Sequence, residues 1–364
     1  MKVAFDAKRA YNNITGLGNY SRSVINSVSK LRKKDTFFLA TPTINQRIYN
    51  IKKSNIELIQ PNKFTNKHFW RFKGINKQLN SEKIDLYHGL SNEIPYNLKI
   101  KSIVTVHDLL FLKYPEFYNY LDRYIYTFKS KIACQQSNQI IATSLQTKND
   151  IINYFQINEN KIKVIYQSCQ NEFIDKSNDD ILKSTIKEKL KKPFLLFVGS
   201  IEKRKNLLFL LKAINKINNI HLICIGRKGD AYNKVLSYIT KNKLEKKITF
   251  LSIYNTNTLA TIYRLSRGLI YPSIDEGFGI PIIEAMYSKI PVITSDKPIF
   301  KEVGGSNSYY FESGKLDSLI SAIKEIWTDS NDRSKRIEKN FNYVQKFNET
   351  QQAEKIVNLY KHLI

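Results

Sequence analysis

The fold class of this chain is indicated most clearly by one stretch, Phe194-Leu-Leu-Phe-Val-Gly-Ser-Ile-Glu-Lys-Arg-Lys-Asn206. Its apolar run Phe194–Val198 predicts a buried strand, and a helical pattern begins at Leu207. Gly199 makes the turn between the strand and the basic loop. A buried strand that leads through a short loop into a helix is the building unit of a parallel sheet, so the stretch predicts an α/β fold.

The same alternation of strand and helix continues on both sides of this stretch. Before it, apolar and β-branched runs predict strands at 2–6, 37–41, 56–60, 85–88, 102–106, 139–143 and 163–166. After it, strands are predicted at 220–225, 248–251, 268–271, 291–294 and 308–311. Polar residues from Asn171 to Lys192 interrupt the pattern with a linker near 170–190. We therefore expect two Rossmann-like domains, 1–172 and 173–345, followed by a helical segment, 346–364.

Composition and length fit a soluble globular protein. The chain has 364 residues, of which 42% are hydrophobic and 25% charged. No apolar run approaches the ~20 residues of a membrane-spanning helix, and the N-terminus does not resemble a secretory signal. Cys134, Cys169 and Cys224 are far apart and lack zinc-ligand spacing, so we expect three reduced, buried thiols and a cytoplasmic protein.

The chain is strongly basic, with 58 Lys and Arg against 32 Asp and Glu and a net charge of +26. Such a charge favours an acidic partner: a nucleic acid, an anionic membrane surface or a phosphorylated substrate. The excess is spread evenly over both halves, which weakens the nucleic-acid interpretation, because that function favours one basic stripe. A solvated lysine surface produced by a biased composition is the alternative.

Two carboxylates follow the predicted strand 268–271, where ligands of such sheets bind. In Ser273-Ile-Asp-Glu-Gly-Phe-Gly-Ile-Pro-Ile-Ile-Glu-Ala-Met286, Glu276 lies in a loop and Glu284 about one and a half turns into a helix. One carboxylate can accept hydrogen bonds from a sugar, and the other can reach a ribose. The alternatives are a helix-terminal charge for Glu276 and an ordinary exposed helical glutamate for Glu284.

The glycines of this segment favour an anion site. Gly277 and Gly279 allow the backbone to approach a ligand closely. The amides of Phe278, Gly279 and Ile280 then lie at the positive end of a helix.

Arg204 and Lys205 stand at a helix start, where cations oppose the helix dipole, so a purely structural role is less natural. They suit a diphosphate, which Arg204 can contact with its forked guanidinium and Lys205 as a point charge. A solvated basic loop is the alternative.

Two further candidates lie in the first half of the chain. A loop with Gly16 and Gly18 follows the first strand, but it is not G-x-G-x-x-G and indicates a dinucleotide site only weakly. His107 ends the strand 102–106 and is placed to contact a substrate hydroxyl; a structural hydrogen-bonding histidine is the alternative. His88 ends another strand with less support.

Two segments mix basic and aromatic residues, Asn66–Lys73 and Tyr114–Lys131. Such surfaces can hold a lipid-linked sugar at an anionic membrane. In the alternative, which we favour for the second segment, its Tyr and Phe residues face the core.

Taken together, these segments resemble the GT-B-fold retaining glycosyltransferases of family 4, the glycosyl transferases group 1, and most of all the mannosyltransferase-like bacterial enzymes of O-antigen and capsule synthesis. The resemblance rests on TGLGNY at 15–20, VHDLLFLKYPEF at 106–117, ATS at 142–144, VGSIEKRKN at 198–206, DEGFGIPIIEAM at 275–286 and PVITSDKPIFKEVGG at 291–305. It implies two Rossmann-like domains that face each other across a cleft, with 346–364 packing back onto the first domain. It also implies that the first domain, 1–172, lies on the acceptor side and that the second, 173–345, binds the nucleotide sugar.

The resemblance also implies roles for single residues. Catalytic roles fall on Glu276, Lys205, Arg204 and His107. Donor-binding roles fall on Gly16, Gly18, Gly199, Phe278, Gly279, Ile280 and Glu284. Glu276 would contact the donor sugar, Glu284 the nucleotide ribose, and the two cations the donor diphosphate.

The implied activity is retaining transfer of a sugar from a nucleotide-diphosphate sugar, GDP-mannose being favoured, to a hydroxyl of a glycan or lipid-linked acceptor in bacterial polysaccharide synthesis. We expect no metal or other cofactor, because Arg204 and Lys205 replace the metal and the chain has no Asp-x-Asp. We expect a cytoplasmic enzyme at the inner face of the plasma membrane, with no nucleic-acid partner. A sugar-nucleotide epimerase of the same fold and a non-enzymatic polyanion-binding protein remain the alternatives.

Overall fold

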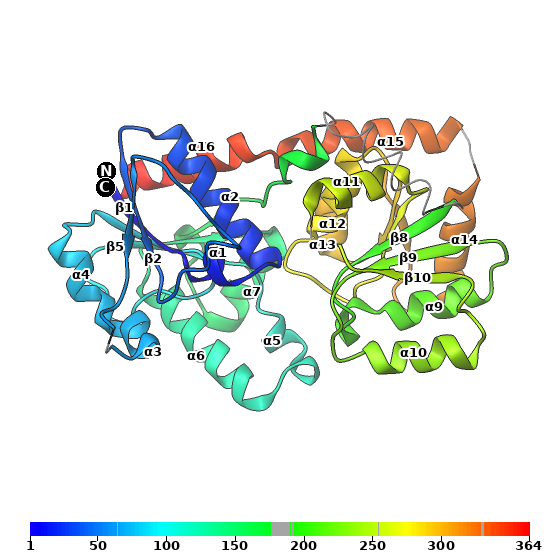
Figure 1. The fold of residues 1–364 in the computed structure, drawn as a ribbon, viewed down its shortest axis with the longest axis horizontal. Helices are drawn as coiled ribbons and strands as arrows, with labels where there is room; N and C mark the ends of the chain where they lie inside the picture. Colours follow the sequence, from blue (N-terminus) through cyan, green and yellow to red (C-terminus); the bar gives the residue numbers. More distant parts are fainter. Residues whose placement is uncertain (64, 176–189, 191–192, 254, 329–330) are drawn as a thin grey trace. The chain divides into compact units, whose positions relative to one another are not determined.

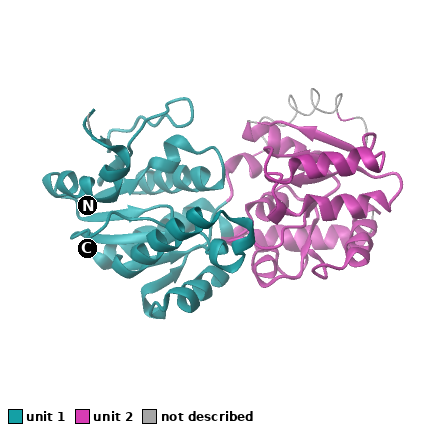
Figure 2. Cartoon of the chain, turned by 90° about the horizontal axis from the view of Figure 1, so that it is seen from below, with its two compact units in different colours: residues 1–168, 347–364 teal, residues 169–346 magenta. Residues whose placement is uncertain are grey.

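The structure is a computed structural model that describes residues 1–63, 65–175, 190, 193–253, 255–328 and 331–364. It divides into two compact units (Figures 1 and 2): unit 1 comprises 1–168 and 347–364, and unit 2 comprises 169–346. The sequence predicted boundaries at 172/173 and 345/346. Positions 176–189 of the expected linker lie outside the described residues.

The described part of unit 1 contains a parallel sheet with the strand order β3-β2-β1-β4-β5-β6-β7. Its strands are β1 (Lys2–Asp6), β2 (Thr36–Ala40), β3 (Ile56–Ile59), β4 (Leu86–Gly89), β5 (Lys101–Val106), β6 (Gln139–Ala142) and β7 (Ile162–Val164). The order reverses direction between β1 and β4, and this switch point is where open α/β sheets bind ligands.

Helices cover both faces of this sheet (Figure 1). They are α1 (Lys8–Asn12), α2 (Gly16–Leu31), α3 (Lys67–Phe69), the π-helical turn η1 (Trp70–Gly74), α4 (Ile75–Ser81), α5 (Leu110–Lys113), α6 (Tyr120–Gln136), α7 (Leu145–Phe155) and α16 (Glu349–Leu363). Short 3₁₀ turns lie at η2 (Pro115–Phe117) and η3 (Glu159–Lys161). Along β1, Val3 and Phe5 pack under α2 and α16, whereas Ala4 packs on the opposite face. This period of two explains the nearly continuous apolar runs, because both faces of a parallel sheet are buried.

The C-terminal helix α16 packs on unit 1, beside α2. Ala353, Ile356 and Tyr360 are part of the core on that face. The Tyr360 hydroxyl lies 2.5 Å from His88 Nδ1, so His88 has a structural hydrogen bond inside the core. The helix therefore completes the fold of the unit in which the chain begins.

The described part of unit 2 contains a second parallel sheet, with the order β10-β9-β8-β11-β12-β13. Its strands are β8 (Phe194–Val198), β9 (His221–Ile225), β10 (Ile248–Leu251), β11 (Leu269–Tyr271), β12 (Val292–Ser295) and β13 (Tyr309–Phe311). This is the strand order of a dinucleotide-binding fold, and its switch point lies between β8 and β11. The prediction of two Rossmann-like units with parallel sheets is confirmed.

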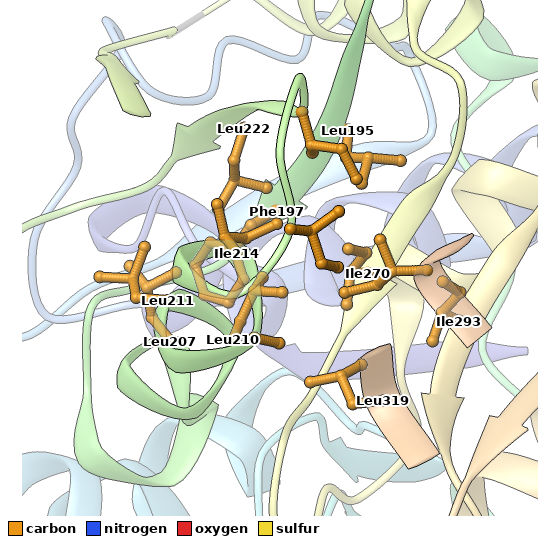
Figure 3. Packing of buried hydrophobic residues seen from close by; sticks show 14 of the residues in the cluster. Leu195, Phe197, Leu207, Leu210, Leu211, Ile214, Leu222, Ile270, Ile293 and Leu319 are labelled. Carbon is orange, nitrogen blue, oxygen red and sulfur yellow. The ribbon is translucent and has the colours of Figure 1, made fainter. Parts of the chain in front are cut away.

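Helices again flank the sheet of unit 2. They are α9 (Leu207–Asn215), α10 (Tyr232–Lys241), α11 (Thr256–Leu265), α12 (Ile280–Tyr287), α13 (Pro298–Gly304), α14 (Leu316–Trp327) and α15 (Asn331–Val344), with 3₁₀ turns η4 (Asn171–Phe173), η5 (Lys203–Lys205) and η6 (Gln345–Phe347). Leu195 and Phe197 of β8 meet Leu210 of α9 and Leu319 of α14 in one buried cluster (Figure 3). The cluster anchors β8, and β8 positions the loop that follows it.

Candidate functional site

The loops after β8 and β11 meet at the switch point of unit 2. The backbone amide of Ile274 donates to the carbonyl of Arg204 over 2.9 Å. In return, Arg204 Nη1 donates to the carbonyl of Asp275 over 2.9 Å. These two contacts hold the basic loop that follows β8 against the acidic loop that follows β11.

A cluster of three charged side chains forms where the loops meet. Glu276 Oε2 lies 2.6 Å from Arg204 Nη1, and Glu276 Oε1 lies 2.6 Å from Lys205 Nζ. The Lys205 ammonium also donates to the Tyr271 hydroxyl over 2.9 Å. All three charged side chains are largely buried. Two cations thus share one carboxylate in a setting with little water.

The electrostatics keep the cluster ionised. Burial alone would raise the pKa of Glu276, but Arg204 and Lys205 outweigh it and lower the pKa to about 2. Burial would lower the pKa of Lys205, but the Glu276 carboxylate outweighs it and raises that pKa. Burial, reinforced by Glu276, raises the pKa of Tyr271 to about 12. At neutral pH the cluster therefore has a neutral phenol beside one carboxylate and two cations.

Glycines shape the backbone around this cluster. Gly199 has a φ of +154° and Gly279 a φ of +117°, values that side-chain-bearing residues rarely adopt. Gly279 caps α12, and Pro281 follows in its first turn, as is common at helix starts. Phe278, Gly279 and Ile280 thus stand at the N-terminal end of α12, as predicted from the sequence, and the Phe278 side chain is buried.

Glu284 lies inside α12 and is buried, so the alternative of an ordinary exposed helical glutamate is wrong. The Tyr263 hydroxyl donates to Glu284 Oε2 over 2.8 Å. Burial nevertheless raises the pKa of Glu284 to about 7, because one hydrogen bond does not replace the hydration of a carboxylate. The protein therefore lowers the pKa of Glu276 and raises the pKa of Glu284.

The candidates of the first half lie in unit 1. His107 is buried, and its Nε2 donates to the carbonyl of Leu90 over 2.9 Å, which leaves Nδ1 as the acceptor nitrogen. Its ring packs edge-on against Tyr20 at 4.6 Å. Burial lowers the pKa of His107 to about 4, so the ring is neutral at pH 7. These contacts give His107 a structural hydrogen bond of the kind that the alternative interpretation expected.

Gly16 and Gly18 begin helix α2. A Cβ at Gly18 would lie 1.8 Å from the carbonyl oxygen of Asn13, whereas a Cβ at Gly16 would meet nothing within 4 Å. The close approach of the Asn13 carbonyl therefore explains, without any ligand, why position 18 requires glycine.

The structure brings together most of the predicted site residues, namely Arg204, Lys205, Gly199, Glu276, Phe278, Gly279, Ile280 and Glu284, in unit 2. The sequence analysis missed the two tyrosines that complete this site, Tyr271 and Tyr263. Tyr271 ends β11 and could have been found from its place before the acidic loop. Tyr263 lies on α11, and no local pattern connects it with Glu284.

No described helix has the length and apolar character needed to cross a membrane. Among the described residues, no group of three or more His, Cys, Asp or Glu side chains is arranged to hold a metal ion. Cys134, Cys169 and Cys224 are free and buried, as expected.

Two family models cover successive parts of the chain. Residues 21–168 match the family described as Glycosyltransferase Family 4, and residues 178–343 match Glycosyl transferases group 1. The first match lies within unit 1 and the second within unit 2.

Curated relatives and solved structures are also similar to this chain. "O-antigen chain mannosyltransferase RfbU" of Salmonella typhimurium is 33% identical over 226 residues, which are 61% of this chain but only 60% of that relative. "O-antigen chain mannosyltransferase B" of Escherichia coli is 27% identical over 285 residues, 76% of this chain and 74% of the relative. The crystal structure of Anabaena Alr3699/HepE in complex with UDP-glucose has a TM-score of 0.77 at 16% identity and covers 100% of both chains.

Proposed function

We propose that this chain, which belongs to the Glycosyltransferase Family 4 and Glycosyl transferases group 1 families and has the GT-B fold, is a retaining glycosyltransferase. In this proposal it moves a sugar from a nucleotide-diphosphate sugar to a hydroxyl of a glycan or lipid-linked acceptor during surface polysaccharide synthesis. Mannose, carried by GDP, is the favoured sugar because the two curated relatives described above are O-antigen mannosyltransferases.

The observation that carries the proposal is the Arg204–Lys205–Glu276 cluster at the switch point of unit 2. When a sugar leaves a nucleotide, negative charge grows on the departing diphosphate. Two preorganised, poorly hydrated cations stabilise that charge at little cost of reorganisation, which is the largest single contribution in many enzymes. The same cations make a metal unnecessary, so we propose that the reaction needs none.

Glu276 has two successive roles in this mechanism. Its carboxylate holds Arg204 and Lys205 in place. When the donor diphosphate contacts the cations, Glu276 shares them and accepts hydrogen bonds from the hydroxyls of the donor sugar. Glu284, in the first turns of α12, accepts hydrogen bonds from the ribose.

The reaction in this proposal retains the anomeric configuration. The acceptor oxygen bonds to the sugar C1 on the face from which the diphosphate departs, while the bond between C1 and the diphosphate oxygen breaks. The acceptor proton passes to that departing oxygen. The protein contributes position and electrostatic stabilisation rather than a nucleophile.

We also propose that unit 1 attaches the enzyme to the inner face of an anionic membrane through helix α6. The α6 stripe, defined as Tyr120, Leu121, Tyr124, Ile125 and Phe128, has exposed fractions of 70%, 68%, 66%, 45% and 48%. These positions share one helix face. The expectation that the aromatic residues of this segment face the core is therefore wrong for the stripe.

The charge around the α6 stripe favours an anionic membrane as its partner. Arg123, Lys129 and Lys131 lie on the same helix against one acidic residue, Asp122. An apolar, aromatic face bordered by basic residues is typical of helices that lie in a membrane interface.

A thermal-shift titration of the purified chain tests the proposed function. GDP-, UDP-, dTDP- and ADP-sugars are added without metal, because a ligand of the folded state must raise the unfolding temperature. We expect GDP-mannose to raise it and Glu284→Ala to abolish the rise. No rise with any nucleotide sugar at millimolar concentration contradicts the proposal. Epimerisation of a nucleotide sugar without an acceptor would support the epimerase alternative instead.

A further inference from the structure

Unit 1 contains a cavity of about 490 Å³ at the switch point of its own sheet. Asp6, the last residue of β1, and Tyr87 of β4 line it, so it lies at the strand ends where these folds bind ligands. Its volume is in the range of small-molecule sites. We name it the Arg71 pocket, and we call the part lined by Arg71, Asp6 and Glu93 its base, because the Arg71 guanidinium there is largely buried.

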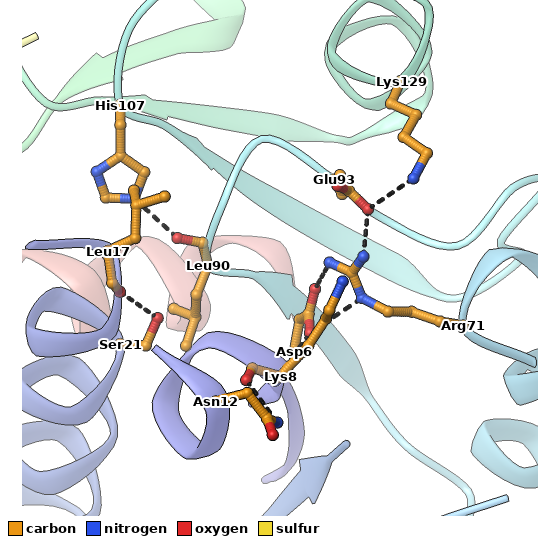
Figure 4. Close-up of polar contacts among 10 residues, drawn as sticks. All are labelled: Asp6, Lys8, Asn12, Leu17, Ser21, Arg71, Leu90, Glu93, His107 and Lys129. Atoms are coloured by element: carbon orange, nitrogen blue, oxygen red, sulfur yellow. Dashed lines mark hydrogen bonds and ion pairs between the residues drawn. The ribbon is translucent and has the colours of Figure 1, made fainter. Parts of the chain in front are cut away.

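Arg71 binds two carboxylates at the base of this pocket (Figure 4). Its Nη2 lies 2.5 Å from Asp6 Oδ2, and its Nη1 contacts Glu93 Oε2. Lys129 of α6 lies 3.6 Å from the same Glu93 oxygen. The two carboxylates are therefore already engaged by cations, and they still offer acceptor oxygens to sugar hydroxyls.

Lys8 adds a cation of a different kind to the pocket wall. It is partly buried, and its ammonium forms no ion pair with a carboxylate in the part of the chain that the structure describes. Burial and the nearby Arg71 lower the pKa of Lys8, and they outweigh the opposite effect of the Glu93 and Asp6 carboxylates, which Arg71 already binds. A partly dehydrated ammonium that forms no direct ion pair is suited to an anionic ligand.

Aromatic side chains form the rim of the pocket. Phe69 is 59% exposed, and Phe72 is stacked on Tyr96 with 5.4 Å between ring centroids. Exposed aromatic faces near a few polar groups are typical of concave ligand sites. Together with Lys67 and His68 at the same rim, they explain the basic and aromatic segment Asn66–Lys73 that the sequence singled out.

We propose that the Arg71 pocket binds the acceptor carbohydrate and that it selects an acceptor with an anionic group, a phosphate or a carboxylate, which Lys8 contacts. This inference rests on the proposed function, because a transferase needs a second substrate site and the residues assigned to the donor diphosphate and ribose lie in unit 2. The carboxylates at the base bind sugar hydroxyls, the rim packs on the sugar, and Lys8 neutralises the anion.

Equilibrium titrations with simple probes test this proposal. Mannose 1-phosphate, glucuronic acid, neutral methyl α-mannoside and inorganic phosphate are titrated into a Lys205→Met background, which weakens phosphate binding at the donor site. We expect one of the two anionic sugars to bind at least tenfold more tightly than methyl α-mannoside. Tighter binding of mannose 1-phosphate identifies a phosphate, and tighter binding of glucuronic acid identifies a carboxylate; either result supports the proposal.

Two variants make the test specific. Lys8→Met should reduce the affinity for the anionic sugar about tenfold and leave methyl α-mannoside unchanged. Lys34→Met removes an exposed lysine just before β2, at the end of the sheet where the strands begin, whereas the pocket lies where they end. This variant should change neither affinity. Because Lys8 is only partly buried, we expect Lys8→Met to remain folded. Arg71→Lys is a second variant, which keeps the positive charge at the base of the pocket.

Three results would overturn the proposal. The first is that neither anionic sugar binds more tightly than methyl α-mannoside, and the second is equal affinity of Lys8→Met and its parent for the preferred anionic sugar. The third is inorganic phosphate binding as tightly as that preferred sugar. Failure of the proposed function looks different. In that case GDP-mannose and the other nucleotide sugars leave the unfolding temperature of the unmodified chain unchanged, whatever the Arg71 pocket binds.

Discussion

The Glu276 carboxylate lies 2.6 Å from the Lys205 ammonium, so a cation that we assign to the donor diphosphate has an acidic partner within the protein itself. Arg204 binds the other oxygen of the same carboxylate. A buried cation without its counter-ion would be strongly destabilising. The cluster therefore exists before the donor arrives, and the donor meets preorganised charges rather than flexible ones.

Lys205→Met should lower kcat/KM about 10²–10³-fold, because it removes one preorganised cation from the departing diphosphate. The fold should persist, since Arg204 still pairs with Glu276. Steady-state kinetics with GDP-mannose measure the loss. The exposed Lys203, two residues earlier, is the matched control, and Lys203→Met should keep its activity within about twofold. Full activity of Lys205→Met would show that the diphosphate assignment is wrong.

Glu276→Gln should make stability less dependent on pH in the acid range. Because Arg204 and Lys205 lower the pKa of Glu276 from 4.5 to about 2, the pair stabilises the fold above pH 4.5 and loses that effect as pH falls toward 2. The linked free energy is about 3 kcal/mol. Denaturant titrations at several pH values should show the two proteins converging between pH 4.5 and 2. A constant difference over this range would contradict the ion pair.

Donor binding should strengthen as pH rises through 7. Burial raises the pKa of Glu284 to about 7, and ribose hydroxyls donate to the ionised form, so the proton must leave before the best contact forms. The same shift makes the fold less stable as pH rises from 4.5 to about 7, because the native state holds this proton more tightly. Isothermal titration with GDP-mannose between pH 6 and 8 measures the first effect. Glu284→Gln should remove both trends; a variant that keeps them points to another titrating group.

Gly18→Ala should destabilise the chain by about 1–3 kcal/mol or more, because the new Cβ would lie 1.8 Å from the Asn13 carbonyl oxygen. Gly16→Ala meets no atom within 4 Å and should change stability by about 1 kcal/mol or less. Thermal or denaturant unfolding compares the two. A Gly18→Ala protein with normal stability and lost activity would assign this glycine to the donor rather than to the fold.

Serine substitutions in the α6 stripe, Leu121→Ser together with Tyr124→Ser, should reduce binding to anionic vesicles at least tenfold. Each change removes exposed apolar surface and leaves the charge intact. Vesicle flotation at low salt measures the effect, with Leu58→Ser as a control because Leu58 is 50% exposed on β3. If the unmodified protein does not float with anionic lipid, the membrane proposal fails.

Much of the fold follows from local patterns. The strands Lys2–Asp6, Phe194–Val198 and Ile248–Leu251 occur where the apolar runs predicted them. The run is most complete in Phe194–Val198, because a strand inside a parallel sheet is buried on both faces. Local signals also account for helix α7, Leu145–Phe155, whose pattern is amphipathic and whose first turn is capped by the Ser144 side chain.

The residues of the proposed donor site also follow partly from the sequence. Arg204, Lys205 and Glu276 were identified because they come directly after β8 and β11, and parallel strands that flank a switch point bring such loops together. The direct contacts among them were not predicted. Three long side chains on two loops have many arrangements, and only the packed structure selects the one in which the carboxylate pairs with both cations.

The α/β class, the two parallel sheets and the loops of the proposed site were all predictable from the sequence, because these features depend on periodicities within a few residues. The tertiary structure alone decided the pairing of Glu284 with Tyr263, the exposure of the α6 stripe and the joining of Arg71 to Asp6 and Glu93. Each of these connects distant segments, or depends on which helix face the neighbouring elements leave uncovered. Charge and burial at such sites arise from packing, and local sequence does not encode the neighbours that packing supplies.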